Sequence, residues 1–248
     1  MLAPRRPWPT DFPDVVIHTT VALRDAHPSY VRAKAGDPDA ALTLAFDLLD
    51  AGAIDGLRSA VAGRAANLLP VIADETAGFY AIPDAMAQVL GRSLGLPVTA
   101  GEIVQINKVG HTRAPAFQRL VTPAVFDDKV KRGAVFVLVD DHVGLGGTLA
   151  NLRGYVESRG SAVIAMTALT ESRDAHHISL RRETRDLLWR QHGMQLDQFW
   201  RDQFGHGLDC LTDVEALQLS RQQSLVAIEN FLAKAAVEAR GRGLAPAL

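Results

Sequence analysis

The chain has 248 residues, of which 48% are hydrophobic and 22% charged, and this usage excludes disordered and fibrous proteins. Lysine and arginine total 26 against 28 acidic residues, so the net charge of -2 provides no basic field for nucleic acid or an anionic membrane. The single cysteine, Cys210, excludes an intramolecular disulfide and a thiolate metal site. We therefore expect a cytoplasmic protein with no nucleic-acid or membrane partner.

The N-terminal third predicts a lead-in followed by helices. Residues 1–13 contain four prolines and no apolar segment, so we expect an extended, mobile lead-in rather than a signal peptide. A helix is predicted from Pro38, with Asp37 or Asp39 as its cap, and Gly52 is expected to separate it from a second helix over 54–66. The first helix is expected to bury Leu42, Ala45, Phe46 and Leu49.

After residue 66 short apolar runs alternate with helical stretches. Strands are predicted over 68–73, 98–106, 134–139 and 162–170, with helices over 84–93 and 148–158 between them. Unbroken apolar strands separated by helices are typical of a parallel sheet covered on both faces. The predicted fold class is therefore α/β.

From residue 179 onward the pattern is helical again. Two apolar stripes indicate core packing rather than a cofactor site, and we expect a helical appendage that packs on the sheet or forms a homodimer contact. The chain is thus divided into an N-terminal lead-in and helical extension (1–66), an α/β core (67–172) and a C-terminal helical extension (173–248). The stripes are Leu196, Phe199, Trp200 and Phe204, and Leu225, Ile228, Leu232 and Ala235.

The segment with the clearest chemistry is 135–148, VFVLVDDHVGLGGT. An apolar strand leads to Asp140 and Asp141, whose carboxylates suit vicinal sugar hydroxyls or a hard cation. Glycines then allow backbone N–H groups to close around an anion, and Thr148 stands where a helix begins and favours phosphate. Phosphate on one side and diol-binding acids on the other describe a phosphorylated ribose.

Other glycine-rich motifs fit this segment less well. A Walker A loop needs a lysine in the turn, and a dinucleotide-binding turn needs a glycine at Leu149 and does not normally follow two acids. A response-regulator domain can also have paired aspartates at the end of a strand, but its acidic pocket would not explain the glycine turn.

The segment resembles the phosphoribosyl-diphosphate (PRPP) motif of the type I phosphoribosyltransferases, and the order of elements over 68–170 is similar to the core of that family. The resemblance implies that Asp140 and Asp141 hold the ribose hydroxyls and that the following turn holds the 5′-phosphate. The residues implied for the turn are Val143, Gly144, Leu145, Gly146, Gly147 and Thr148.

The resemblance also assigns the turn after the first core strand, ADETAG at 73–78, to pyrophosphate. Thr76, Ala77 and Gly78 are the implied contacts, and Asp74 and Glu75 repel pyrophosphate unless Mg²⁺ lies between them. The loop over 107–123 takes the place of the flexible hood of the family. Its implied catalytic cations, which stabilise the departing pyrophosphate, are Lys108, Arg113 and Arg119.

Two alternatives stay open at these flanking segments. The loop over 107–123 is equally well a solvated polar loop. His176 and His177 lie beyond the last predicted strand, where a nucleobase can bind, but surface histidines are the favoured interpretation. Two adjacent histidines do not easily face one metal, and no third ligand is evident.

The resemblance implies an enzyme that moves the 5-phosphoribosyl group from PRPP to a nitrogen acceptor, with Mg²⁺ as cofactor and pyrophosphate as the second product. Leu145 stands where the family has serine or threonine, and this departure, with the acidic ADETAG turn, favours a second hypothesis. In that hypothesis the chain senses PRPP or a nucleotide without turnover and signals through its helical flanks. A third is a hydrolase-like or specialised transferase whose flanks select an uncommon acceptor.

Overall fold

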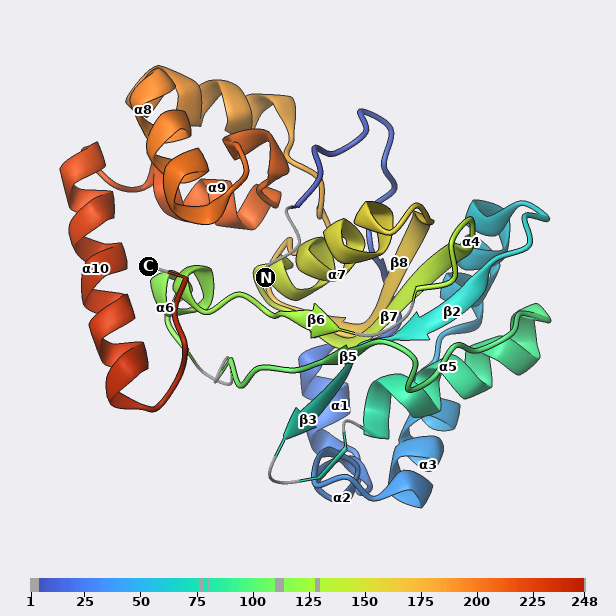
Figure 1. The fold of residues 1–248 in the computed structure, drawn as a ribbon. Coiled ribbons are helices and arrows are strands. Elements are labelled where there is room, and N and C mark those ends of the chain that lie inside the picture. The colour runs from blue at the N-terminus through green and yellow to red at the C-terminus, as the bar shows by residue number, and fades with distance from the viewer. Residues whose placement is uncertain (1–4, 76–77, 80, 110–113, 128–129, 248) are drawn as a thin grey trace.

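A computed structural model gives the fold (Figure 1) and describes residues 5–75, 78–79, 81–109, 114–127 and 130–247; for 74–75 and 78–79 it describes the backbone alone. The central sheet has four strands in the order β1-β8-β7-β2, and all of its pairs are parallel. The predicted α/β class is therefore confirmed. The strands are β1 (Val16–Ile17), β2 (Asn67–Pro70), β7 (Val135–Val143) and β8 (Ala162–Glu171).

Helices cover both faces of this sheet, as unbroken apolar strands predict. Phe136 and Leu138 of β7 pack with α7 (Gly147–Ser158) on one face. Val137 and Val139 point to the opposite face because side chains alternate along a strand. That face is covered by α3 (Pro38–Leu48), α4 (Ala51–Val61) and α5 (Ala81–Leu94).

The segment before residue 67 is thus part of the core packing. It supplies edge strand β1 and the helices α3 and α4, and two further short helices, α1 (Val21–Ala26) and α2 (Tyr30–Lys34), precede them. The domain boundaries after residues 66 and 172 stay predictions.

Two details of the N-terminal helices were predicted wrongly. Gly52 lies inside α4, because the break comes earlier, where the Asp50 side chain caps α4 by accepting the Ala53 N–H at 2.8 Å. Phe46 is 77% exposed, since the buried face of α3 is displaced by one residue from the predicted one. The buried residues of α3 are Ala40, Ala41, Leu44 and Ala45.

A second, smaller sheet has the order β4-β3-β5-β6. Its strands β3 and β5 take up parts of the strands predicted over 68–73 and 98–106, so neither predicted strand forms as a whole. The strand predicted over 68–73 is split at Val71, whose N–H still donates to Val139 of β7 at 2.8 Å, while Ile72 pairs with Val104 instead. The strand predicted over 98–106 is mostly irregular. The bounds are β3 (Ile72–Glu75), β4 (Gly78–Phe79), β5 (Val104–Gln105) and β6 (Phe126–Asp127).

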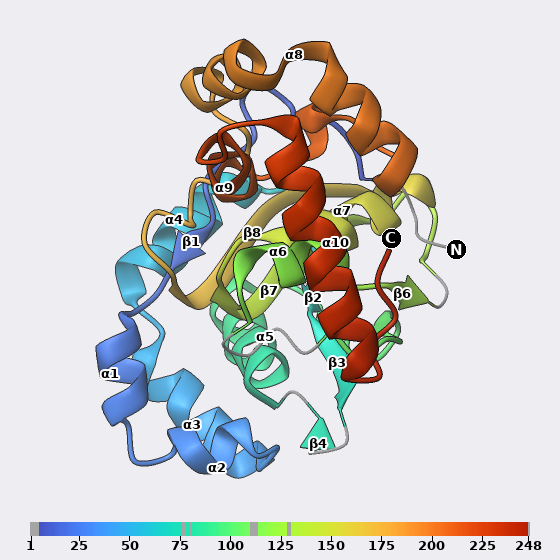
Figure 2. The same cartoon turned by 90° about the vertical axis from the view of Figure 1, so that its left-hand side faces the viewer.

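The C-terminal helices pack on one another and on α6 (Ala116–Val121). Leu196 and Trp200 are fully buried there, so core packing, as predicted for the aromatic stripe, is confirmed. In Figures 1 and 2, α8 and α9 lie above the central sheet, α1–α3 lie below it, and α10 runs along the side of the molecule next to α6. The elements are α8 (Arg182–Phe204), the 3-10 helix η1 (Leu208–Cys210), α9 (Asp213–Ser220) and α10 (Leu225–Gly241).

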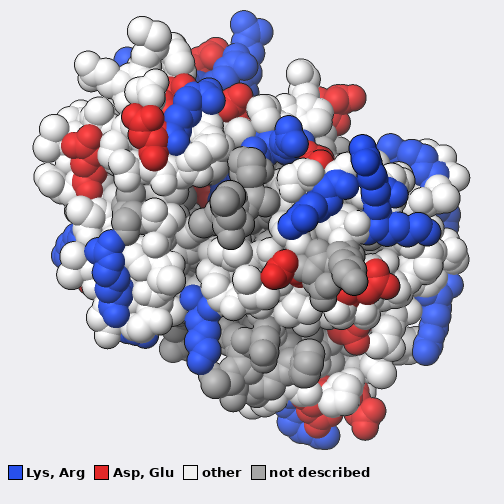
Figure 3. Space-filling view, in the orientation of Figure 1, with Lys and Arg blue, Asp and Glu red and all other residues white. Residues whose placement is uncertain are grey.

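Two surface properties bear on partners. Among the described residues, no helix combines the length and apolarity needed to cross a bilayer. On the face drawn in Figure 3, basic and acidic side chains are interspersed rather than gathered into a field of one sign.

Candidate functional site

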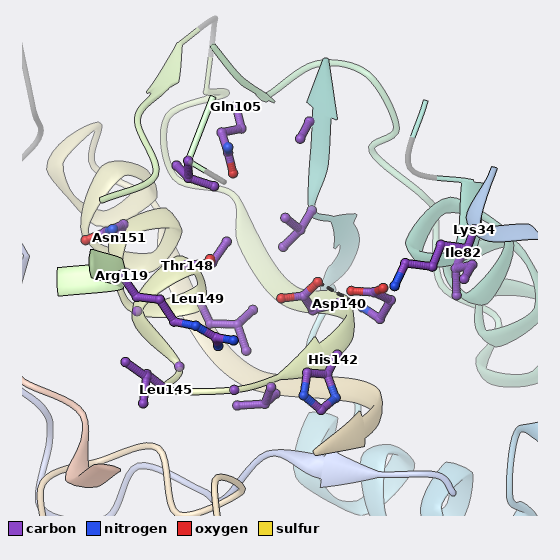
Figure 4. Close-up of a pocket in the computed structure, with 18 of the residues that line it drawn as sticks. Lys34, Ile82, Gln105, Arg119, Asp140, His142, Leu145, Thr148, Leu149 and Asn151 are labelled. Atoms are coloured by element: carbon purple, nitrogen blue, oxygen red, sulfur yellow. Dashed lines mark hydrogen bonds between the residues drawn. The ribbon is translucent and has the colours of Figure 1, made fainter. Parts of the chain in front are cut away.

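A cavity of about 530 Å³ lies beside the carboxyl end of β7 (Figure 4). Ligands of open parallel sheets bind outside the carboxyl ends of the strands, so its position suits a binding site. Its lining brings together most of the residues that the sequence singled out. These are Arg119, Asp140, Asp141, Val143, Gly144, Leu145, Gly146, Gly147 and Thr148.

The two acids lie inside β7 rather than after it. The strand continues to Val143 because β8 runs on beside it, pairing Asp140 with Ala168 and Val143 with Glu171. The predicted end at residue 139 is therefore too early. Asp140 is only 7% exposed whereas Asp141 is half-buried, so the adjacent carboxyl groups have different surroundings.

Burial, and then the charge of Asp141, raise the pKa of Asp140 well above the ordinary aspartate value. The Asp140 Oδ1 accepts the backbone N–H of Asp141 at 2.8 Å, and none of the ion pairs between described residues includes Asp140. The protonated form of Asp140 is thereby favoured, and it offers a hydrogen-bond donor beside the acceptor oxygens of Asp141. Such a pair matches two neighbouring hydroxyl groups.

His142 connects the acidic pair to the neighbouring strand and to α1. Its Nδ1 lies 2.9 Å from Thr170 Oγ1, which also accepts a hydrogen bond from Arg24 Nη1 at 2.8 Å. Burial lowers the pKa of His142, although the charge of Asp141 opposes this shift, so the neutral imidazole is favoured. The sequence analysis passed over His142, although its place between the acids and the glycine turn was a usable signal.

The glycine turn is shaped by close approach of the C-terminal segment. Gly146 has φ +81°, and a Cβ there would collide with Ile178 Cδ1. Gly147, where α7 begins one residue earlier than predicted, leaves room for Glu215, whose Oε1 would lie 2.7 Å from a Cβ. Because a helix N-terminus presents unpaired N–H groups, the turn remains suited to an anion.

A buried ion pair that the sequence analysis missed lies beside this turn. Arg5 donates from Nη2 to Glu215 Oε1 at 2.9 Å and from Nε to Asn151 Oδ1 at 2.6 Å, and the Arg5 and Glu215 side chains are 8% and 2% exposed. From Arg5 onward the lead-in is therefore packed against the fold, where it was expected to be mobile. Trp8 adds a hydrogen bond from Nε1 to the Leu211 carbonyl at 2.8 Å.

A second contact ties the turn to α9. Thr212, the N-cap of α9, donates from Oγ1 to the Leu145 carbonyl at 2.5 Å, and its backbone N–H donates to Glu215 Oε2 at 3.0 Å. Thr212 and Leu145 are 67 positions apart in the chain, so no local sequence pattern predicts their contact.

The three predicted hood cations have different positions. Arg119 lies against the turn, where a Cβ on Gly144 would collide with its Nη1, and burial lowers the pKa of its guanidinium. Lys108 is exposed and is absent from the cavity lining, although its neighbour Val109 contributes to it. Arg113 lies outside the described residues.

The hood loop predicted over 107–123 is partly helix. It contains α6, whose Leu120 and Val121 are buried against the C-terminal helices. Asn107 ties its two ends, donating from Nδ2 to the Pro123 carbonyl at 2.8 Å and accepting the Val125 N–H at 2.8 Å. This part of the chain is therefore anchored at both ends and at α6.

Helices α1 and α2 add charge that the sequence analysis did not connect with the site. In Figure 4, Lys34 and Arg119 point into the cavity from opposite sides, with Asp140 between them. The Arg24 guanidinium lies 4.7 Å from the centre of the Tyr30 ring and pairs with Asp25 at 2.8 Å. Positive charge thus flanks the acidic pair on both sides.

The predicted pyrophosphate turn is described only in part. Thr76 and Ala77 lie outside the described residues, while Asp74 and Glu75 end β3 and pair antiparallel with Phe79 and Gly78 of β4. Mg²⁺ at Asp74 and Glu75 stays a prediction. Asp141, whose side chain is described, is a half-buried carboxylate next to the turn. It suits a hard cation better than Asp140, which is buried and has a raised pKa.

No protein family model matches the chain. The chain is 37% identical over 240 residues to Protein TraN of Escherichia coli, an alignment that covers 97% of this chain and 53% of TraN. It is 39% identical over 152 residues to a protein of Haemophilus influenzae, covering 61% of this chain and 34% of that protein. The chain therefore spans about half the length of the first relative and about a third of the second.

Solved structures of phosphoribosyltransferases are also similar to the chain. The adenine phosphoribosyltransferase of Rhodothermus marinus has 18% identity and a TM-score of 0.33, over 67% of this chain and 81% of that enzyme. The hypoxanthine phosphoribosyltransferase of Trypanosoma cruzi has 12% identity and a TM-score of 0.34, over 52% and 68%. Similarities this weak establish neither the fold nor the activity of the chain. The functional proposal therefore rests on the residues of the cavity.

Proposed function

We propose that the chain binds PRPP in this cavity and transfers its 5-phosphoribosyl group to a nitrogen acceptor, releasing pyrophosphate. The observation that supports this most is the continuity of the acidic pair and the glycine turn along one wall of a single cavity, with Arg119 at the turn. A diol site and an anion site that adjoin in this way match the two ends of a phosphorylated ribose.

The chain's residues act mainly by positioning. Asp141 accepts from one ribose hydroxyl, and Asp140 shares a hydrogen bond with the other. The N–H groups at the start of α7 and the Arg119 guanidinium hold anionic oxygens. When the bond from ribose C1 to pyrophosphate breaks, pyrophosphate keeps the electron pair, the acceptor nitrogen bonds to C1, and the nitrogen's proton passes to solvent.

Two further groups complete the proposal. Lys34 faces the acidic pair from the side opposite Arg119, where a cation favours the departing pyrophosphate. Mg²⁺, when bound, neutralises charge on the pyrophosphate oxygens. The acceptor is a small molecule whose identity depends on the shape of the cavity.

The test is pyrophosphate release from PRPP and Mg²⁺ across a panel of nitrogenous bases, with a no-acceptor control. Turnover that needs an acceptor and is lost in the Asp141→Asn variant supports transfer. Release without an acceptor indicates a hydrolase-like reaction. Absence of turnover with every base, when calorimetry still detects PRPP binding, rejects the transferase.

A second candidate is a sensor that binds PRPP or a nucleotide without consuming it. The contacts of Thr212 with Leu145 and of Arg5 with Glu215 favour it, because they join the turn directly to α9 and to the lead-in. A ligand held at the turn then acts on elements at both ends of the chain. A sensor predicts that ribose 5-phosphate or PRPP changes the proteolysis of α9 while PRPP stays intact.

A further inference from the structure

A second cluster of metal-ligating side chains lies apart from the cavity. Asp14, His176 and His177 each offer one ligand atom, and these atoms all lie within 4.8 Å of one another. None of the three lines the cavity. The sequence shows no third ligand near the two histidines, and the fold supplies one, Asp14, from 163 residues away in the chain.

The backbone explains how the three residues meet. Asp14 lies just before β1, and the adjacent Val15 N–H donates to the His176 carbonyl at 2.9 Å. The turn after β8 reverses the chain at Asp174, which has φ +58°. Ala175 and Ile178 are fully buried on either side of the histidine pair and hold the two imidazole rings with their centroids 4.0 Å apart.

The hydrogen bonds of the rings already resemble those of metal ligands. His176 Nδ1 lies 2.8 Å from Glu171 Oε2, and the same carboxylate accepts the His176 backbone N–H at 2.7 Å. Ligating histidines commonly donate their second ring nitrogen to a carboxylate in this way, which leaves Nε2 of His176 for a metal. His177 Nδ1 lies 2.9 Å from Asp14 Oδ2, so two of the ligands are already adjacent.

We propose that Asp14, His176 and His177 bind a divalent transition metal, Zn²⁺ in the first instance, with Glu171 orienting His176. Two imidazoles and one carboxylate suit zinc, whereas Mg²⁺ prefers oxygen ligands alone. Ligand atoms around tetrahedral zinc lie ~3.3 Å apart, so a pair near the 4.8 Å limit must close by up to ~1.5 Å. Side chains that are 51%, 32% and 31% exposed for Asp14, His176 and His177 have the freedom to do so.

The bound ion joins the segment before β1 to the loop after β8. Strand β1 is an edge strand with only two residue pairs to β8, so a metal clip beside it holds the lead-in on the sheet. This site does not depend on the proposed phosphoribosyl transfer.

The experiment is calorimetric titration of the full, tag-free chain with ZnCl₂, with and without excess MgCl₂. We expect one Zn²⁺ per chain, unaffected by Mg²⁺, and a loss of at least tenfold in affinity in each of Asp14→Asn, His176→Gln and His177→Gln. Glu171→Gln should weaken binding by roughly tenfold or more. His27→Gln is the matched control, because His27 Nε2 contacts Asp47 at 3.2 Å in a pair without a second histidine, and its affinity should equal that of the wild type.

Substitution with Co²⁺ gives a second readout. The cobalt spectrum should show d–d bands without a thiolate charge-transfer band, because Cys210 is buried and burial raises its pKa to about 12. Circular dichroism of each variant verifies the fold. The proposal is overturned by the absence of stoichiometric Zn²⁺ binding, by wild-type affinity in a variant that combines Asp14→Asn, His176→Gln and His177→Gln, or by a thiolate band.

Discussion

Removing the two carboxylates of β7 tests the ribose site most directly. We expect the double variant Asp140→Asn with Asp141→Asn to lose PRPP binding and keep its fold. Asparagine Oδ1 is still able to accept the Asp141 N–H that Asp140 Oδ1 accepts at 2.8 Å, so the local backbone need not move. The substitutions remove the negative charge of the pair and the hydrogen-bond donor that the protonated Asp140 carboxyl group provides.

The magnitude follows from the number of hydrogen bonds lost. A hydrogen bond to the charged Asp141 contributes about 1.5–3 kcal/mol and one to the protonated Asp140 about 0.5–1.5 kcal/mol, so the two losses give roughly 2–4.5 kcal/mol if they add. That range corresponds to a weakening of about 30-fold to 2,000-fold in Kd. Asp140 is 7% exposed, so solvent offers little compensation at that position.

Calorimetric titration with PRPP and Mg²⁺ measures this loss. The exposed Asp55 of α4 provides the matched control, because Asp55→Asn removes one negative charge away from the cavity and should leave Kd unchanged. If the double variant binds PRPP as tightly as wild type, the acids do not hold the ribose. If Asp55→Asn weakens binding equally, the effect is one of net charge and the assignment fails.

Three other predictions address the turn, the cation and the buried acid. In the Gly147→Val variant the new side chain meets Glu215, so we expect a loss of about 1–3 kcal/mol of stability and of the protection that ribose 5-phosphate gives against heat. Gly56→Val is the control, because a Cβ at Gly56 meets open space. Thermal melts with and without ribose 5-phosphate test this, and equal protection of both variants contradicts it. Arg119→Ala should weaken PRPP binding by roughly tenfold or more, and unchanged affinity by calorimetry removes Arg119 from the site. Because the pKa of Asp140 is raised on folding, the destabilising effect of Asp140 is absent below the ordinary aspartate pKa and grows as pH rises toward the folded value. Asp140→Asn should therefore raise Tm at neutral pH but not in acid, and a pH-independent difference contradicts this.

The sequence predicted the centre of the site because that part depends on local order. The apolar run before Asp140 and the glycines before Thr148 are contiguous, and strand, turn and helix follow one another directly in the chain. The extent of β7 was underestimated, since pairing with β8 through residue 143 is a non-local property. The same holds for β3, where pairing with β5 ends the predicted strand at Val71.

The remaining lining of the cavity was decided by tertiary structure alone. Arg5 and Glu215 lie 210 residues apart and give no pattern of their own, yet they form a buried ion pair beside the glycine turn. Asp14 and His177, which lie outside the cavity, are also brought together only by the fold, from 163 residues apart. Local periodicity determines which segments become strands and helices, because it reflects short-range backbone and side-chain geometry. Which charged groups face one another depends on how those segments pack. Packing brings together residues that are far apart in the chain, so it cannot be read from local sequence patterns.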